Sequence, residues 1–136
     1  MRPSFYDVSQ FPRLARIAAQ WQIIRDEFLL LNRPIMNIHR SGKSREEVYR
    51  ELMLEIQSGK QFGWLLGWGK NGANPDWLAY PLIQQNTVIP FITTEMQKTI
   101  AMFKELSGIK VCSLLKMKPN TFLPTHTHPE IRREGL

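Results

Sequence analysis

Large apolar side chains recur at three- and four-residue steps along the first part of the chain. This spacing places them on one stripe of an α-helix, and Pro12 suits its first turn. Asn32-Arg33-Pro34 would end the helix, because a residue before proline disfavours the helical conformation. The pattern predicts a helix over residues 11–31 that packs its stripe against a sheet containing residues 109–117. The stripe consists of Leu14, Ile17, Trp21, Ile24, Phe28 and Leu31.

Capping signals indicate two further helices. Ser44 and Glu47 match a capping box, in which each side chain satisfies a backbone amide that the helix leaves free. This second helix is expected to stop at Ser58-Gly59, a typical helix end. A third helix is predicted from Thr93 or Thr94 to Gly108. It would carry Met96, Ile100 and Phe103.

Strand-like stretches lie between and after these helices, bounded by glycine, proline and asparagine. The expected strands are 62–68, 77–83 and 109–117, with a turn over 71–75 and a shorter segment at 121–125. Helices first and strands later predict an α+β fold, with helices packed against an antiparallel sheet. Since there is no repeat or low-complexity linker, we expect a single domain over residues 1–136.

Composition predicts a hydrophobic core and a cellular compartment for this protein. A chain of 136 residues with 43% hydrophobic and 22% charged residues is typical of one globular domain. The single cysteine, Cys112, is expected to be a small buried hydrophobe in a reducing compartment. No apolar run is long enough to span a bilayer, and the N-terminus lacks a secretory h-region, so we expect a cytoplasmic protein. The tryptophans are expected to anchor the core: Trp21, Trp64, Trp68 and Trp77.

The net charge of +6 raises the question of a nucleic-acid partner. The basic residues are dispersed singly and in pairs, with acidic residues between several of them. The sequence contains no zinc-finger or ribonucleoprotein motif. The charge therefore predicts a solvated basic surface and no nucleic-acid partner.

His126 and His128 carry the clearest metal-binding chemistry in the chain. Two histidines two residues apart on a strand point the same way, because side chains alternate between faces, so both imidazoles could reach one ion. Non-haem iron sites combine a histidine and a carboxylate at this spacing with a distant second histidine. Such pairs also occur as surface or hydrogen-bonded loop residues, so both interpretations stay open.

Three blocks of sequence add weight to the metal interpretation. The first is Trp21 followed by Ile-Arg-Asp-Glu at 24–27. The second, at 116–121, reads Lys-Met-Lys-Pro-Asn-Thr and is followed by His-Thr-His-Pro at 126–129. Between them lie Asp-Trp at 76–77 and Gln-Gln at 84–85. In order and spacing these blocks resemble the aspartyl/asparaginyl β-hydroxylase family of Fe(II)- and 2-oxoglutarate-dependent dioxygenases.

The resemblance implies a fold and a set of roles. The family fold is a double-stranded β-helix, a jelly-roll or cupin-like barrel with helices on one side. His126 matches the first iron-binding histidine, and Met117 matches a position near the 2-oxoglutarate pocket. Leu115 stands where some members have serine, and His128 where many such oxygenases have the metal-binding carboxylate. The implied cofactors are Fe(II) and 2-oxoglutarate, and the implied substrate is a peptide (aspartyl or asparaginyl side chain) or a lipid acyl chain.

Two groups that the family uses have no match here. Its second iron-binding histidine and its cosubstrate-binding arginine lie well beyond the first histidine, whereas this chain ends at Leu136, and His39 matches no ligand position. We therefore expect the N-terminal portion of a hydroxylase domain with an incomplete site and no assignable catalytic residue. Its open sheet edges could allow self-association. The alternative is a non-catalytic binding module derived from the same fold, and a nucleic-acid-binding protein is a third reading that rests on charge alone.

Overall fold

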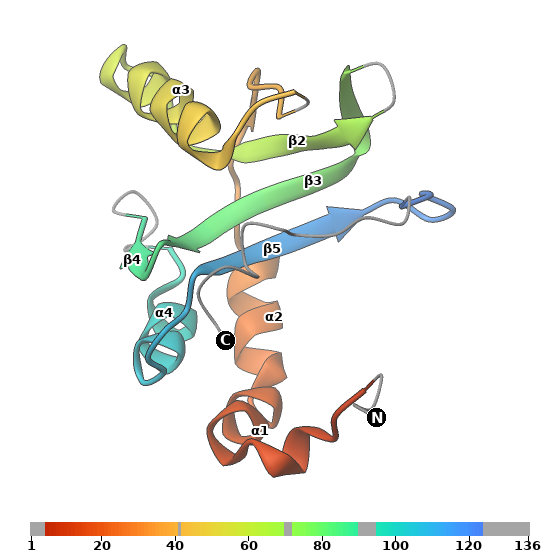
Figure 1. Cartoon of the computed structure of the whole chain (residues 1–136), viewed down its shortest axis with the longest axis vertical. Helices are drawn as coiled ribbons and strands as arrows, with labels where there is room; N and C mark the ends of the chain where they lie inside the picture. The colour runs from red at the N-terminus through yellow and green to blue at the C-terminus, as the bar shows by residue number, and fades with distance from the viewer. Residues whose placement is uncertain (1–4, 41, 70–71, 90–94, 124–136) are drawn as a thin grey trace.

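A computed structural model describes residues 5–40, 42–69, 72–89 and 95–123. These residues form four α-helices and a sheet of five strands, which confirms the α+β expectation (Figure 1). The helices are α1 (Pro12–Ala18), α2 (Trp21–Leu29), α3 (Arg45–Gln57) and α4 (Gln97–Lys104), with a short 3-10 helix, η1 (Val8–Gln10), before α1. The strands are β1 (Ile35–Met36), β2 (Trp64–Gly69), β3 (Gly72–Gln84), β4 (Thr87–Val88) and β5 (Val111–Met117).

The described strands form an open, mixed sheet. Their order is β1-β2-β3-β4, and β5 pairs with the opposite edge of β3. β1 runs parallel to β2, and the other pairs are antiparallel. Ala79 pairs with Leu65 and Leu115 at once, so β3 is the central strand. These strands do not close on themselves, and the barrel implied by the resemblance is not confirmed.

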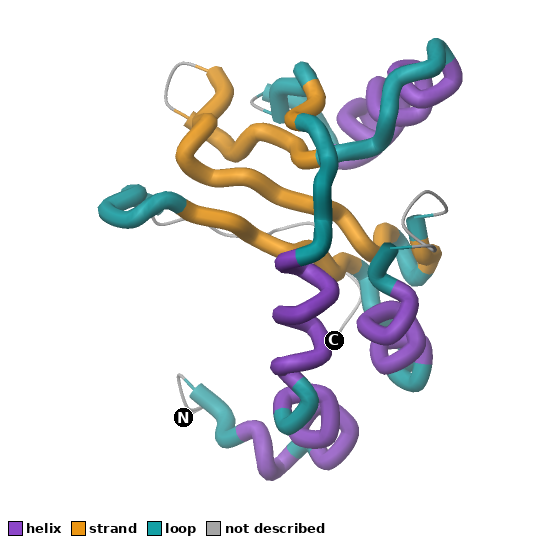
Figure 2. Tube along the Cα trace, turned by 180° about the vertical axis from the view of Figure 1, so that it is seen from behind, coloured by secondary structure: helices purple, strands orange, loops and turns teal. Residues whose placement is uncertain are grey.

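The first predicted helix is two helices, because the chain turns at Ala19–Gln20. α1 lies at the far end of α2 from the sheet (Figures 1 and 2). The expectation that the whole stripe packs on the sheet is therefore wrong: Leu14 is 44% exposed and Trp21 is 53% exposed. Only the last part of α2 reaches the core, where the Phe28 ring meets the Trp64 ring edge-on, with centroids 5.8 Å apart.

Local signals placed α3 correctly. The Ser44 hydroxyl accepts from the Glu47 amide at 3.2 Å, and the Ser44 amide donates to the Glu47 carboxylate at 2.9 Å. The helix stops just before Gly59, whose φ of +97° is a conformation that glycine adopts readily. The capping box and the glycine end are thus confirmed.

Other boundaries differ from the prediction. α4 is shorter than expected, and its proposed caps, Thr93 and Thr94, lie outside the described residues. β3 begins at Gly72, so most of the expected turn over 71–75 is strand. The short strands β1 and β4 were not predicted; β4 follows Gln85 and Asn86, whose positive φ angles are typical of a two-residue hairpin turn. Residues 121–123 form no strand, and the rest of that predicted segment lies outside the described part.

The main core lies on the helical side of the sheet. Alternation along β3 turns Leu78, Tyr80 and Leu82 to this side. Tyr80 is fully buried, and its ring lies 5.2 Å from that of Trp64 and 4.9 Å from that of Phe62. Met96 and Ile100 cover this layer from the α4 segment. Trp64 and Trp77 are buried as expected, whereas the exposure of Trp21 corrects the prediction for that residue, and the Trp68 side chain is outside the description.

Candidate amphipathic pocket

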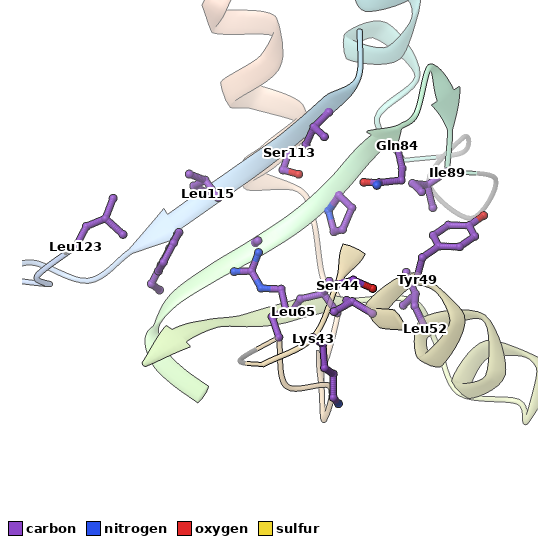
Figure 3. A pocket seen from close by; sticks show the side chains of 16 residues that line it. Lys43, Ser44, Tyr49, Leu52, Leu65, Gln84, Ile89, Ser113, Leu115 and Leu123 are labelled. Atoms are coloured by element: carbon purple, nitrogen blue, oxygen red, sulfur yellow. The ribbon is translucent and has the colours of Figure 1, made fainter. Parts of the chain in front are cut away.

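A pocket of about 340 Å³ occupies the face of the sheet that α2 and α4 leave uncovered (Figure 3). Its floor includes Leu65, Ala79 and Leu115, which lie in one row across β2, β3 and β5. α3 and the loop before it supply a wall. Figure 3 shows Leu123 at one end, with Tyr49 and Ile89 at the other. The remaining lining residues are Arg40, Lys43, Ser44, Val48, Leu52, Trp77, Pro81, Gln84, Val111 and Ser113.

Strand alternation and one irregularity decide which side chains reach the pocket. On β5, Val111, Ser113 and Leu115 line it, while Cys112 and Leu114 pack against the core behind. On β3 the register shifts between Pro81 and Ile83. Because one extra residue reverses the alternation, Gln84 joins Pro81 on the pocket side.

Trp77 and Arg40 form one corner of the pocket. A Cβ atom added at Gly67 would lie 2.8 Å from the Cδ2 and Cε3 atoms of the Trp77 indole, so glycine is what allows this ring to lie against β2. The guanidinium carbon of Arg40 lies 5.5 Å from the centre of the Trp77 ring. The Arg40 Nε also donates to the Leu66 carbonyl at 2.9 Å. These contacts hold the Arg40 side chain at the edge of the pocket.

The described lining residues include two cations and no acid. The Lys43 ammonium pairs with the Glu51 carboxylate of α3 at 2.6 Å, and Glu51 does not line the pocket. The two cations of the lining are therefore Arg40, beside the Trp77 ring, and Lys43, paired with Glu51. Neutral polar groups add hydrogen-bonding capacity around otherwise apolar walls: Ser44, Tyr49, Gln84 and Ser113.

Of the three site residues proposed from the sequence, the structure describes Met117. Met117 ends β5 opposite Trp77 and is 41% exposed; it is not among the residues lining the pocket, whereas Leu115, two residues earlier, is. His126 and His128 lie outside the described residues. His39 is exposed, and no three histidine, cysteine, aspartate or glutamate side chains in the described ranges gather into a metal-binding group.

The first resemblance block lies away from the pocket. Glu27 accepts hydrogen bonds from the amides of Lys98 and Thr99 at the start of α4. Trp21 stacks under the Arg25 guanidinium, whose carbon is 5.0 Å from the ring centre. The roles seen for this block are structural.

Cys112 is half-buried and packs against the core, close to its expected role. Burial raises the pKa of its thiol, which disfavours the reactive thiolate.

Sequence reasoning did not identify Arg40, Lys43, Tyr49 or Ser113 as site residues. Arg40 and Lys43 precede α3 in a stretch with no periodicity, and they reach the pocket only because α3 docks beside the sheet. Ser113 carried one usable signal: it is a hydroxyl at an alternating position of a predicted strand with apolar neighbours. No local pattern marked the others.

Comparison with known proteins adds no relative. No family model matches the chain, and neither a curated protein nor a solved structure matches it. Within the described ranges no helix is long and apolar enough to cross a membrane. The fold and the site define an α+β protein with a helix-backed open sheet and an amphipathic pocket on the other face.

Proposed function

We propose that this chain is an Fe(II)/2-oxoglutarate-dependent dioxygenase-like protein of the aspartyl/asparaginyl β-hydroxylase type. The observation that carries the proposal is that the middle resemblance block lines the pocket, and that residues just before and just after the Lys116–Thr121 block line it too. Trp77 and Gln84 line it from the middle block, and Leu115 lines it directly beside the Lys116–Thr121 block. Leu123 also lines it, and His126 follows only three residues later in the sequence.

In the proposed site, His126 and His128 would hold the iron, and the pocket would hold the substrate. Imidazole nitrogens are suitable iron ligands, so the donor chemistry of His126 and His128 fits this metal. Iron with 2-oxoglutarate supplies the oxidising power to hydroxylate an unactivated carbon. The apolar floor of Leu65, Ala79 and Leu115 would orient the substrate and exclude water. In this proposal the open sheet is part of a double-stranded β-helix, and the substrate is an aspartyl or asparaginyl side chain or a lipid acyl chain.

A non-catalytic binding module is the second candidate. It is favoured by a pocket whose described lining already combines apolar walls with polar groups and contains no histidine. Such a module would bind its ligand without a metal. The two candidates therefore share the pocket and differ in the role of His126.

Iron binding distinguishes these roles. Because the family's second iron-binding histidine has no match in this chain, we expect weak Fe(II) binding, measured by anaerobic titration of the purified protein. His126→Ala should weaken it by at least about tenfold. His39→Ala, the matched control at an exposed histidine, should leave it unchanged. Fe(II) binding that survives His126→Ala would refute the role given to this residue.

Turnover is the second test. No arginine stands at the family's cosubstrate offset, and His39 matches no ligand position. We therefore expect this 136-residue chain by itself to release succinate from 2-oxoglutarate, with Fe(II) and ascorbate, no faster than an iron-only blank. Succinate above that blank that disappears in His126→Ala would show a working oxygenase, and the binding-module alternative would then be wrong.

A further inference from the structure

We infer that the pocket binds a small uncharged molecule that has an apolar body and a carboxamide head. The body is assigned to the floor of the pocket and to α3, and the head to the side chains of Gln84 and Ser113. This binding requires only the described pocket residues and no metal. It therefore stands or fails separately from the iron chemistry proposed above.

The size and walls of the pocket suit a compact apolar body. Its volume of about 340 Å³ lies within the range of roughly 300–1,000 Å³ that small-molecule sites occupy. Leu65 and Ala79 form a floor that is almost completely buried, at 3% and 2% exposure. Val48 and Leu52 of α3 complete the apolar surface from the side. A hydrocarbon or aromatic group placed here leaves water for a preformed apolar site, which favours binding.

Gln84 and Ser113 place two neutral polar groups near each other beside this floor. Gln84 pairs with Val111 in the register of β3 and β5, and Ser113 is the next residue of β5 that lines the pocket. Diagonal neighbours of this kind lie within reach of long side chains. Figure 3 shows the Gln84 amide directed toward the strand that carries Ser113. One ligand head can therefore meet both side chains.

Both side chains have hydrogen-bonding capacity to offer a ligand. Within the ranges that the structure describes, no hydrogen bond to another protein group engages the Gln84 amide or the Ser113 hydroxyl. A carboxamide presents the groups that match them, since its carbonyl accepts and its NH2 donates. The Gln84 amide has the same donor and acceptor pair, and the Ser113 hydroxyl can both donate and accept. A carboxamide head can thus enter the pocket without leaving its own polar atoms unpaired, which would be costly.

The cations of the lining favour an uncharged head, because both already have protein partners. The Lys43 ammonium pairs with the Glu51 carboxylate. The Arg40 guanidinium donates to the Leu66 carbonyl and lies beside the Trp77 ring. A ligand carboxylate would have to leave water and compete with these partners. A neutral head avoids that cost.

The test compares three probes of nearly the same size and shape, titrated without iron into the isotope-labelled full chain. 4-Phenylbutanamide carries the proposed head, 5-phenylpentan-2-one has a methyl group in place of the NH2, and 4-phenylbutyrate has a charged oxygen there. We expect the carboxamide to shift the amide signals of residues 79 and 111–115. It should bind about three- to tenfold more tightly than the ketone, the effect of one hydrogen bond, and more tightly than the acid.

Gln84→Met tests the assignment of the head, because methionine keeps the length of the side chain and removes its amide. This variant should bind the carboxamide and the ketone equally. Gln57 lies exposed at the end of α3 and does not line the pocket, so Gln57→Met is the matched control and should keep the preference for the carboxamide. Equal affinity of the two probes for the unaltered chain, or a preference that persists in Gln84→Met, would overturn this assignment. Equal or tighter binding of the acid would replace the neutral head with an acidic one.

Ser113→Leu tests the site itself. Leucine at this position of β5, opposite Pro81, would project an apolar group into the space where the ligand body is placed. It should abolish binding of the carboxamide, whereas Ser107→Leu, in the exposed loop after α4, should leave binding unchanged. A dispersed spectrum confirms that each variant is folded. Absence of binding by all three probes, or binding that Ser113→Leu leaves intact, would overturn the site.

Discussion

At the scale of single residues, a polar cluster beside the core joins two distant parts of the chain. The Arg33 guanidinium, just after α2, donates through Nε to the Glu95 carboxylate at 2.6 Å, and its Nη2 donates to the second carboxylate oxygen. Glu95 raises the pKa of Arg33, as expected for a bidentate pair. The hydroxyl of buried Tyr80 lies 3.5 Å from the same carboxylate. Ionising Tyr80 would place a second negative charge beside Glu95.

The stability of the protein should therefore fall at alkaline pH partly through Tyr80. Burial, and secondly the charge of Glu95, raise the pKa of this phenol above its ordinary value. Above a pH of about 10, the unfolded chain loses this proton while the folded chain keeps it. The free energy of unfolding then decreases as the pH rises above about 10. The decrease is at most about 1.4 kcal/mol per pH unit, because one proton is involved.

Urea denaturation of the unaltered chain and Tyr80→Phe at several pH values between 9 and 11.5 measures this effect. The free energy of unfolding should fall less steeply with pH in Tyr80→Phe, because the variant cannot ionise at this position. Parallel curves for the two proteins would show that Tyr80 titrates alike in both states.

At the scale of elements, one glutamate connects α2 to α4. Met96 is the N-cap residue of α4, and its side chain makes no capping hydrogen bond. Glu27 of α2 takes that place: its carboxylate accepts from the Thr99 amide at 2.6 Å, the Thr99 hydroxyl at 2.7 Å and the Lys98 amide at 3.1 Å. A negative charge at a helix N-terminus is also favoured by the helix dipole. The contact caps α4 and fixes α2 against it.

Glu27→Ala should accordingly lower the free energy of unfolding by about 1–3 kcal/mol, because it leaves amides at the start of α4 without their acceptor. The neighbouring Asp26→Ala is the control, since Asp26 is exposed and pairs only with Arg25 in the contacts described here. Its effect should stay within about 0.5 kcal/mol. Both values come from urea denaturation at neutral pH, and equal effects of the two substitutions would contradict the capping role.

At the scale of the whole molecule, the two faces of the sheet have different tasks. One is covered by α2 and α4 over a core that includes Tyr80, and the other holds the pocket. β3 is hydrogen-bonded to β2, β4 and β5. Because its side chains alternate in direction, it contributes residues to both faces of the sheet. α1 stands apart at the end of α2 (Figure 2).

This arrangement predicts a gradient of local stability. Amides of residues 78–80 in β3 should exchange with deuterium most slowly, because opening them requires the sheet to separate. Amides of α1 should exchange at least about a hundredfold faster, since few buried contacts hold that helix. Hydrogen exchange followed by NMR measures both, and comparable protection of α1 and β3 would show that α1 is held by packing absent from this structure.

The sequence by itself determined the features that depend on neighbouring residues. The capping box and Gly59 placed α3, and strand-like composition placed most of β2, β3 and β5, because hydrogen bonds at helix ends and side-chain alternation are local. The α+β class followed from their order. For the candidate site, the resemblance quoted Trp77 and Gln84, and both line the pocket, whereas the histidine roles remain predictions.

Only the tertiary structure decided which apolar surface is covered. Periodicity showed that Trp21 and Phe28 share a stripe, but the chain turns at Ala19–Gln20 and the sheet reaches only the end of α2, so Trp21 is exposed and Phe28 packs on Trp64. The pocket likewise depends on how distant elements pack together. Arg40 lies next to the Trp77 ring, 37 positions away in sequence, through the docking of α3 and its preceding loop beside β2 and β3. Contacts over such separations depend on how whole elements pack, which no local pattern of residues specifies.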